Sequence, residues 1–439
     1  MKSLWIIISV TSCLCVFKYT ERMIRIMMLF QTVILAALMA MGCDSEENVN
    51  VDEQVEEQDV AIPDWELGYM DIHQISTGCG DVAFAILPDG TTMLIDAGES
   101  YGAIDAVIPP RPNSSLRPME WVARYIKHFS EPLGTNGALD YAFLTHMDGD
   151  HIGTMDKATT SYNGKYKLTG ITHIASLVDV ETLVDRGYPD YNYPSDSWFE
   201  SWGEIMTNYK AFVQERDAQG KKNERFAVGS NTQFRLKKNA GAYPDFEIRN
   251  IVGNGEVWTG EGTSVRKVFE AQQFKGENSL SCGIHIHYGD FDYITLGDIQ
   301  GVNNSGGAMD METEVAPLVE DMDVVNANHH AYSDAMNETF IKATRPKAFV
   351  IPSRDNFHPS AAPLARMLSK DLYPDYRYVF ATGITDKNLV TLGDNGKLVR
   401  NGHIVVRIYD GGKEFRIFVL DDSEESYKVI YQTGVLSAL

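Results

Sequence analysis

Residues 145–153 read Thr-His-Met-Asp-Gly-Asp-His-Ile-Gly, and they follow a short apolar run, Tyr141-Ala-Phe-Leu144, that is typical of a strand. Four side chains in this stretch can bind a metal ion: His146, Asp148, Asp150 and His151. Isolated charges are too costly to bury at the end of a strand, whereas a divalent cation binds imidazole and carboxylate groups together. The stretch therefore predicts a metal site at a strand end. The alternative is a polar turn whose acidic residues have no role.

The spacing of these residues, H-x-D-x-D-H after a strand, resembles the H-x-H-x-D-H signature of the metallo-β-lactamase superfamily, with Asp148 in place of the second histidine. This variant is similar to the hydrolase domain of the competence protein ComEC and its relatives. The resemblance implies an αββα sandwich, in which helices cover two packed sheets. It also implies one or two divalent cations, zinc or manganese, as the cofactor.

The segment 78–98 is similar to the G-x-G-D…LPDG…IDAG opening of ComEC-like domains, and its apolar runs predict strands joined by tight turns. Asp96 ends the last of these strands. The resemblance implies that the Asp96 carboxylate lies beneath the metal site and orients a ligand histidine. A simple strand cap is the alternative for this residue.

Two later motifs supply further ligands. Asp298 ends the run Tyr293-Ile-Thr-Leu-Gly-Asp298, which matches the strand-end Gly-Asp of the superfamily, where the carboxylate bridges two metals. Asn278-Ser-Leu-Ser281 resembles the N-x-S-L run that precedes this hairpin in ComEC relatives. His329 and His330 correspond to the histidine pair of the D-V-L-x-x-x-H-H-G motif, although Ala-Tyr here replaces the usual Gly-Ser. We expect one of the two to bind metal, and the sequence does not separate them.

Two residues are expected to take part in catalysis. Asp150 could orient the attacking water as well as bind metal. His358 stands before Pro359, where ComEC relatives carry His-Pro before a helix, and we expect Pro359 in the first helical turn. A histidine at a helix N-terminus could hold a phosphate or protonate a leaving group. The alternative is a helix-entry histidine with no role.

One superfamily feature is absent, because no G-H-x-x-G-H precedes Asp298, and the third histidine of the first metal has no counterpart. His173 and the alternating pair His285 and His287 are substitutes by residue type only. An oxygen-rich first site would admit manganese as well as zinc. Its expected ligands are His146, Asp148 and Asp298.

The N-terminal region resembles a bacterial lipoprotein signal. An apolar stretch over 27–41 ends in Leu38-Met-Ala-Met-Gly-Cys43, so Cys43 would carry the lipid after cleavage. We predict a leader over 1–42 and an acidic tether over 43–64, within which 44–59 carry eight acidic residues and no Lys or Arg. The expected location is the cell envelope, at the outer membrane or cell surface of a bacterium. An uncleaved membrane helix is the alternative.

The folded part is expected over 65–439, as one hydrolase domain with a helical, aromatic-rich insertion at about 175–250. Eight aromatic residues between 188 and 212 could line a cleft or pack a small core of their own. The apolar face of 118–129 predicts a helix. Further strands are expected at 246–252, 281–288, 291–296, 404–408 and 415–420.

The formal net charge of −23 has the wrong sign for tight binding of duplex nucleic acid, which depends on Lys and Arg contacts to phosphate. The resemblance implies phosphodiester cleavage by a metal-bound hydroxide. We therefore expect a small-molecule or exposed phosphoester as the substrate. The alternatives are a hydrolase of the same fold acting on a lactone, amide or ester bond, and a non-catalytic surface binding lipoprotein on a degenerate scaffold.

Overall fold

The computed structural model describes residues 60–439 apart from 79, 102–105 and 303–308, and all described elements belong to one compact unit, 53–439. The predicted leader, the lipidation residue Cys43 and most of the tether lie outside the described residues. Among the helices that the structure describes, none is long and apolar enough to cross a membrane.

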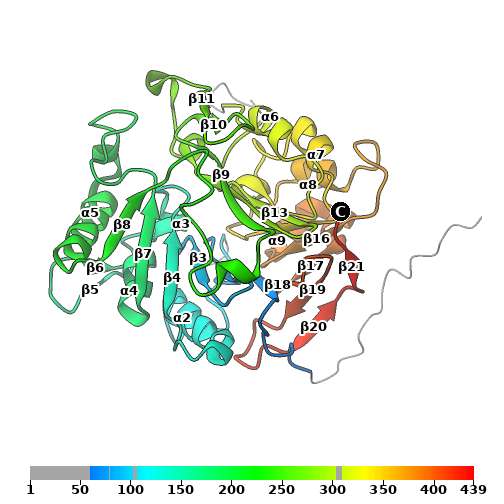
Figure 1. Cartoon of the computed structure of the whole chain (residues 1–439), viewed down its shortest axis with the longest axis horizontal. Coiled ribbons are helices and arrows are strands. Elements are labelled where there is room, and N and C mark those ends of the chain that lie inside the picture. Colours follow the sequence, from blue (N-terminus) through cyan, green and yellow to red (C-terminus); the bar gives the residue numbers. More distant parts are fainter. Residues whose placement is uncertain (1–59, 79, 102–105, 303–308) are drawn as a thin grey trace, which may run out of the picture. The chain divides into compact units, whose positions relative to one another are not determined.

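The first of two large sheets has the strand order β20-β19-β18-β1-β2-β3-β4-β7-β8, with β21 paired to β19 (Figure 1). The C-terminal hairpin β18–β19 pairs with β1, so strands from both ends of the described chain lie side by side in one sheet. The strands are β1 Met70–Gln74, β2 Ala83–Ile86, β3 Thr92–Ile95, β4 Leu139–Phe143, β7 Val180–Asp185, β8 Lys222–Arg225, β18 His403–Ile408, β19 Glu414–Leu420, β20 Val429–Gln432 and β21 Leu436–Ser437.

The second sheet has the order β11-β10-β9-β12-β13-β14-β15-β16-β17, and the strands from β13 to β17 run parallel. Its strands are β9 Phe246–Gly253, β10 Glu256–Trp258, β11 Val265–Lys267, β12 Gly283–Tyr288, β13 Phe291–Thr295, β14 Val324–Asn326, β15 Ala348–Ile351, β16 Tyr378–Ala381 and β17 Val399–Asn401. A two-stranded sheet of β5 Thr159–Thr160 and β6 Lys167–Leu168 stands apart.

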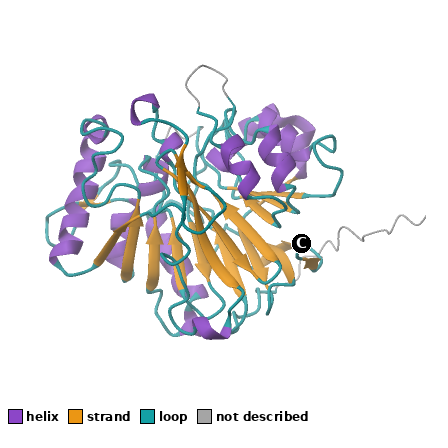
Figure 2. Ribbon diagram, turned by 45° about the horizontal axis from the view of Figure 1, so that its top comes forward, coloured by secondary structure: helices purple, strands orange, loops and turns teal. Residues whose placement is uncertain are grey.

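Helices cover the outer face of each sheet, as Figure 2 shows. Helices α2, α4 and α5 pack on the first sheet, and α6 to α9 pack on the second. Their bounds are α2 Pro118–Phe129, α3 Gly149–Ile152, α4 Gly170–Leu177, α5 Gly203–Ala218, α6 Glu312–Val315, α7 Glu338–Thr344, α8 Ala361–Leu368 and α9 Asp386–Leu392. The predicted helix over 118–129 is confirmed at both ends.

Strand alternation explains the layers. In β2, Ala83 and Ala85 pack between the sheets, whereas Phe84 and Ile86 pack under the helices. Both faces of such a strand are buried, so its sequence is an unbroken apolar run. The fold is the predicted αββα sandwich, with one core between the sheets and one beneath each helical layer.

Of the two expected roles of the aromatic-rich segment, lining a cleft or packing a small core of its own, the described part of the structure does not show the separate core. Strands β7 and β8 within the segment extend the first sheet, and its buried aromatic side chains join the core beneath α2. Tyr191 and Tyr209 each donate a hydroxyl hydrogen bond to the Asp185 carboxylate, at 2.8 and 2.7 Å. These hydrogen bonds hold the aromatic-rich segment against the end of β7, so the segment packs on the first sheet.

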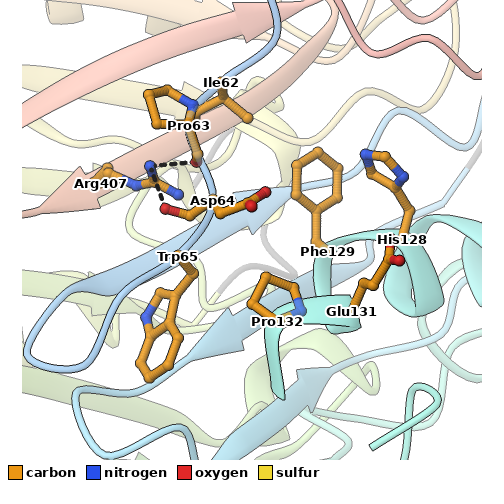
Figure 3. Close-up of a pocket in the computed structure, with 9 residues that line it drawn as sticks. All are labelled: Ile62, Pro63, Asp64, Trp65, His128, Phe129, Glu131, Pro132 and Arg407. Carbon is orange, nitrogen blue, oxygen red and sulfur yellow. Dashed lines mark hydrogen bonds between the residues drawn. The ribbon is translucent and has the colours of Figure 1, made fainter. Parts of the chain in front are cut away.

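A buried arginine fastens the start of the described chain to the first sheet (Figure 3). Arg407 pairs with Asp71 and donates hydrogen bonds to the carbonyl oxygens of Pro63 and Asp64, at 2.6 and 3.5 Å. A cavity of about 280 Å³ lies beside it, and its lining includes Trp65, Phe129 and Pro132. None of the predicted metal ligands lines this cavity, so we assign it no catalytic role.

Candidate metal centre

The motif over 145–153 lies where β4 ends and α3 begins. Asp148 is the N-cap of α3, and Asp150 and His151 lie within its single turn. The imidazoles of His146 and His151 are fully buried, with their ring centroids 4.1 Å apart. Ordinary helix geometry therefore brings side chains that are neighbours in sequence to one buried point.

Asp298, which follows β13, lies at the centre of this group. Its two oxygens are 3.3 Å from His151 Nε2, 3.5 Å from His330 Nε2 and 3.8 Å from His146 Nε2. The backbone N–H of Asp298 donates to the hydroxyl oxygen of Ser281, which fixes the turn. The Asp298 carboxylate is thus placed between the two halves of the centre.

The structure separates the two adjacent histidines. His330 points Nε2 into the centre, 3.4 Å from Asp150 Oδ2, while its Nδ1 donates to the Pro352 carbonyl oxygen at 3.0 Å. His329 instead has both ring nitrogens engaged by other side chains. Its Nδ1 lies 2.6 Å from Asp334 and its Nε2 lies 2.9 Å from the Asn278 amide nitrogen. His329 Nε2 also lies 3.8 Å from Asp298 Oδ2, so His330, at 3.5 Å and, among the described residues, without another side chain on Nε2 outside the centre, is the better candidate ligand of the pair.

The backbone carrying these histidines is strained. His329, His330 and Ala331 have φ values of 46°, 50° and 55°, in the left-handed region that a β-carbon disfavours. Each such residue costs on the order of 1–3 kcal/mol, and such residues persist where surrounding structure holds them. Here the Ala331 carbonyl accepts a bond from the Ser360 N–H, and the His329 N–H donates to the Gly297 carbonyl.

Asp96 orients a predicted ligand rather than capping a strand. Its Oδ2 lies 2.8 Å from His151 Nδ1, and its two oxygens also accept bonds from the backbone N–H and the hydroxyl of Thr145. Because Nδ1 of His151 donates to Asp96, the Nε2 lone pair of His151 is left facing the centre.

The distances between donor atoms in the centre are close to the distances between ligand atoms that share one bound cation. His151 Nε2 and His330 Nε2 face each other at 3.2 Å, with each Nδ1 hydrogen already donated elsewhere. If both rings are neutral, two Nε2 lone pairs at this distance repel, and either a proton or a metal cation between them removes the repulsion. Two ligands about 2.0–2.1 Å from a tetrahedral zinc lie roughly 3.3 Å apart. The distances among His151, His330, Asp150 and Asp298 are 3.2–3.5 Å where a contact is recorded.

Unpartnered atoms point to a second cation. His146 Nε2 and Asp148 Oδ1 are buried and have no hydrogen-bond partner within the part of the chain that the structure describes. His146 Nε2 lies 3.7 Å from Asp148 Oδ2 and 3.8 Å from Asp298 Oδ2. Leaving such polar atoms without a partner costs about 1–3 kcal/mol each, which a bound cation would remove.

The charges of the centre also favour a cation. Burial raises the pKa of Asp298, but His330, His151 and His329 outweigh burial and hold this pKa well below its ordinary value. Burial lowers the pKa of His330, but Asp298 and Asp150 raise it to about 10. The carboxylates thus favour positive charge at this point, which either protons on the imidazoles or a bound metal cation would supply.

Two cationic or titratable side chains border the centre. Arg354 Nε forms an ion pair with Asp150 Oδ2 at 2.7 Å, and its side chain is 35% exposed. His358 stacks on Tyr332, and its Nδ1 donates a hydrogen bond to the Asp355 carboxylate at 2.7 Å. His358 Nε2 is buried without a partner among the described residues. His358 lies beside the candidate ligand His330, with the ring centroids 5.5 Å apart.

The position of Pro359 differs from the expected first helical turn. Helix α8 begins at Ala361, with Ser360 as its N-cap, so Pro359 lies before the helix. The Ser360 N–H donates to the Ala331 carbonyl, and its hydroxyl donates to the Phe357 carbonyl. These bonds hold the chain in a turn next to the histidine pair before the helix can start.

Sequence reasoning missed a buried ion pair next to the centre. Glu277 accepts bonds from the Arg186 guanidinium, both at 2.5 Å, from the Met147 N–H at 3.0 Å and from Trp198 Nε1 at 2.7 Å. Glu277 therefore supports the backbone between the predicted ligands His146 and Asp148. Its only sequence signal was its place directly before the Asn278 motif.

Asp81 is a second residue that the sequence analysis did not single out. A potential ligand atom of Asp81 lies within 4.8 Å of potential ligand atoms of Asp96 and His151. Burial raises the pKa of Asp81 to about 6. Its place directly after Gly80, at the end of the G-x-G-D opening, was the available signal.

The suggested substitutes for the missing third histidine lie elsewhere. His173 faces Glu99, with 3.9 Å between Nδ1 and Oε2. His285 and His287 contact Asp292 on the second sheet. The oxygen-rich first site of His146, Asp148 and Asp298 therefore stays a prediction, without a third histidine among these three substitutes.

No family model matches the chain, and no curated protein matches it. Among solved structures, the chain is similar to the crystal structure of Tm1679, described as a metal-dependent hydrolase of the beta-lactamase superfamily. The identity is 12% and the TM-score 0.31, and the similarity covers 71% of this chain and 95% of that chain. Values this low assign no activity to the present chain, whose αββα architecture is established by its own sheets and helices.

Proposed function

We propose that this chain is a metal-dependent hydrolase with two cation positions. One position would be formed by Asp150, His151 and His330, the other by His146 and Asp148, with Asp298 between them. The observation that carries the proposal is the set of 3.2–3.5 Å distances among buried donor atoms, which fit ligands of a shared cation.

Bound cations would supply Lewis-acid polarisation of the scissile group and a water of lowered pKa. The protein side chains fix the geometry in which this chemistry could occur. Asp96 holds the His151 ring in the tautomer that presents Nε2, and the Pro352 carbonyl does the same for His330. The role we propose for His358, whose unpartnered Nε2 and closeness to His330 support it, is to exchange a proton with the leaving group.

A phosphodiester is the substrate class that we propose. Arg354 brings a partly exposed guanidinium to the edge of the centre, and its planar fork suits the paired oxygens of a phosphate. The net charge of −23 favours a small or exposed phosphoester over duplex nucleic acid. Zinc and manganese both fit the mixed nitrogen and oxygen donor set.

We also propose that the chain is a surface lipoprotein anchored through Cys43. The proposal is supported by the signal-like run before Cys43 and the acidic tether after it. Replacing Cys43 by Ala should move the protein from the membrane fraction to the soluble fraction in a bacterial host. Unchanged membrane association would contradict the lipid anchor.

Metal content and substrate preference test the proposed activity. The purified protein should hold about two equivalents of zinc or manganese in this centre and should hydrolyse bis(p-nitrophenyl) phosphate. Asp150→Ala should lose this activity, whereas Asp371→Ala, which removes an exposed carboxylate, should keep it. A purified protein that binds no stoichiometric metal would contradict the hydrolase proposal. Cleavage of lactone, ester or amide substrates without phosphodiester cleavage would retain the hydrolase and reject the substrate class.

A further inference from the structure

A second cluster of histidine and carboxylate side chains lies on the β12–β13 hairpin. Ile284 and Ile286 of β12 pack between the sheets, so the alternating residues His285 and His287 project from the other face. Asp292 of β13 pairs directly opposite His287 in the antiparallel register. We call His285, His287 and Asp292 the outer cluster.

The three side chains converge on one point. His285 Nε2 lies 2.6 Å and His287 Nδ1 lies 2.8 Å from the same oxygen, Asp292 Oδ1. The side chains of His285 and Asp292 are each 19% exposed, and that of His287 is 42% exposed. The cluster is therefore partly shielded from water yet open to solutes.

The surroundings of the outer cluster are acidic. Glu247 of β9 stands directly opposite His287 on the other side of β12, and Asp245 lies two residues earlier. Arg249 is the positive group in this lining, and it is paired with Glu247 at 2.9 Å. Together with the two histidines these residues line a groove of about 510 Å³, which leaves room for a hydrated cation beside the cluster.

We propose that the outer cluster is a separate binding site for a transition-metal cation of the zinc class. Two imidazole nitrogens and one carboxylate oxygen, all within 4.8 Å of one another, form a ligand set that zinc prefers and that magnesium and calcium do not. The N···O distances in the outer cluster are those of hydrogen bonds. Zinc binding therefore requires that the protons on these two ring nitrogens leave and that the three side chains move slightly apart. The partial exposure of His287 permits this movement.

This site is independent of the proposed catalytic centre. The two share no residue, and they lie at opposite ends of β13, since Asp292 is near its start and Asp298 follows its end. Water or an anionic group would complete the zinc coordination, with the Glu247 carboxylate nearby on the adjacent strand. The cation would join β12 and β13 through their side chains.

Zinc stoichiometry tests the site. The full chain, with any histidine tag removed, is stripped with chelator, dialysed against micromolar zinc and analysed for bound metal. The double variant His285→Gln/His287→Gln should bind one zinc fewer than wild type and should hydrolyse substrate at the same rate. The matched control His128→Gln, which removes an exposed histidine of α2, should bind the wild-type number. Equal zinc content in the double variant and wild type would overturn the proposal.

A zinc-soaked crystal of the wild-type protein gives a test that does not depend on a variant folding. An anomalous zinc peak in contact with His285 Nε2, His287 Nδ1 and Asp292 is expected. Its absence, while the centre around Asp298 holds zinc, would overturn the outer site and leave the proposed hydrolase intact.

Discussion

The metal centre and the outer cluster both combine histidines with carboxylates, but they differ in burial and in sequence distance. The centre draws Asp96, His151, Asp298 and His330 from the ends of separate strands and buries all of them. The outer cluster comes from eight consecutive positions of one hairpin, 285–292, and stays partly exposed.

This difference shows what each group needs from the fold. Charges buried in the centre are costly unless every partner is in place, so the centre depends on supporting residues such as Asp96 and Glu277. In the outer cluster, water can replace a missing partner. We therefore expect substitutions in the centre to have much larger effects than equivalent substitutions in the outer cluster.

The largest effect is expected for Asp298→Asn, because this carboxylate contacts both halves of the centre. Loss of several kcal/mol of charge stabilisation corresponds to a fall in kcat/KM of at least about 10³-fold. Steady-state hydrolysis with saturating zinc or manganese measures it. The matched change Asp292→Asn in the outer cluster should leave kcat/KM unaltered. A fall of less than tenfold in Asp298→Asn would contradict the central position of this residue.

A smaller effect is expected for Asp96→Asn, which removes the acceptor that orients His151. The affinity of the centre for metal should fall by roughly 10- to 100-fold, as is usual when the partner of a metal-binding histidine is lost. Competition with a chelator of known affinity measures this change. Activity should recover when excess metal is added. Failure of added metal to restore activity would show that Asp96 does more than position His151.

Arg354→Gln should separate binding of an anionic substrate from metal binding. Loss of one charge-assisted hydrogen bond, about 1.5–3 kcal/mol, would raise KM for a phosphodiester by roughly tenfold or more and leave metal content intact. Arg266→Gln, at an exposed arginine of β11, is the control. An equal rise in KM for a neutral ester would argue against a phosphate contact.

The smallest effect concerns a buried histidine that belongs to neither cluster. His403 Nδ1 accepts a bond from the Ser76 N–H, and burial lowers its pKa to about 3. A depressed histidine pKa favours the neutral form, so its contribution to stability is present above pH 6.5 and is lost as the pH falls toward 3. With chelator present, the free energy of unfolding measured in urea should fall less between pH 6.5 and acid pH for His403→Gln than for wild type. Parallel pH profiles would contradict this assignment.

Much of the fold could be predicted because apolar runs and turns are local signals. The expected strand that ends at Asp96 and the helix over 118–129 agree with β3 and α2. The packing of the aromatic segment could not be predicted in this way. Its attachment depends on Tyr191 and Tyr209 reaching Asp185, a tertiary contact with no periodic signature in the sequence.

The candidate site shows the same limit. Residues of the 145–153 motif converge because a strand end and a helical turn place them together, which sequence spacing encodes. The choice between His329 and His330 depends on the Pro352 carbonyl and the Asp334 carboxylate, which constrain the two rings differently. Glu277 was missed because its partner Arg186 lies 91 residues away in the chain.

The presence of two cations in the centre is the claim on which the proposed function depends. Anomalous diffraction from a crystal soaked in zinc or manganese tests it most directly. The proposed function predicts two peaks, one on each side of Asp298. One should contact His151, His330 and Asp150, and the other should contact His146 and Asp148. A well-ordered centre with no anomalous peak under these conditions would contradict it.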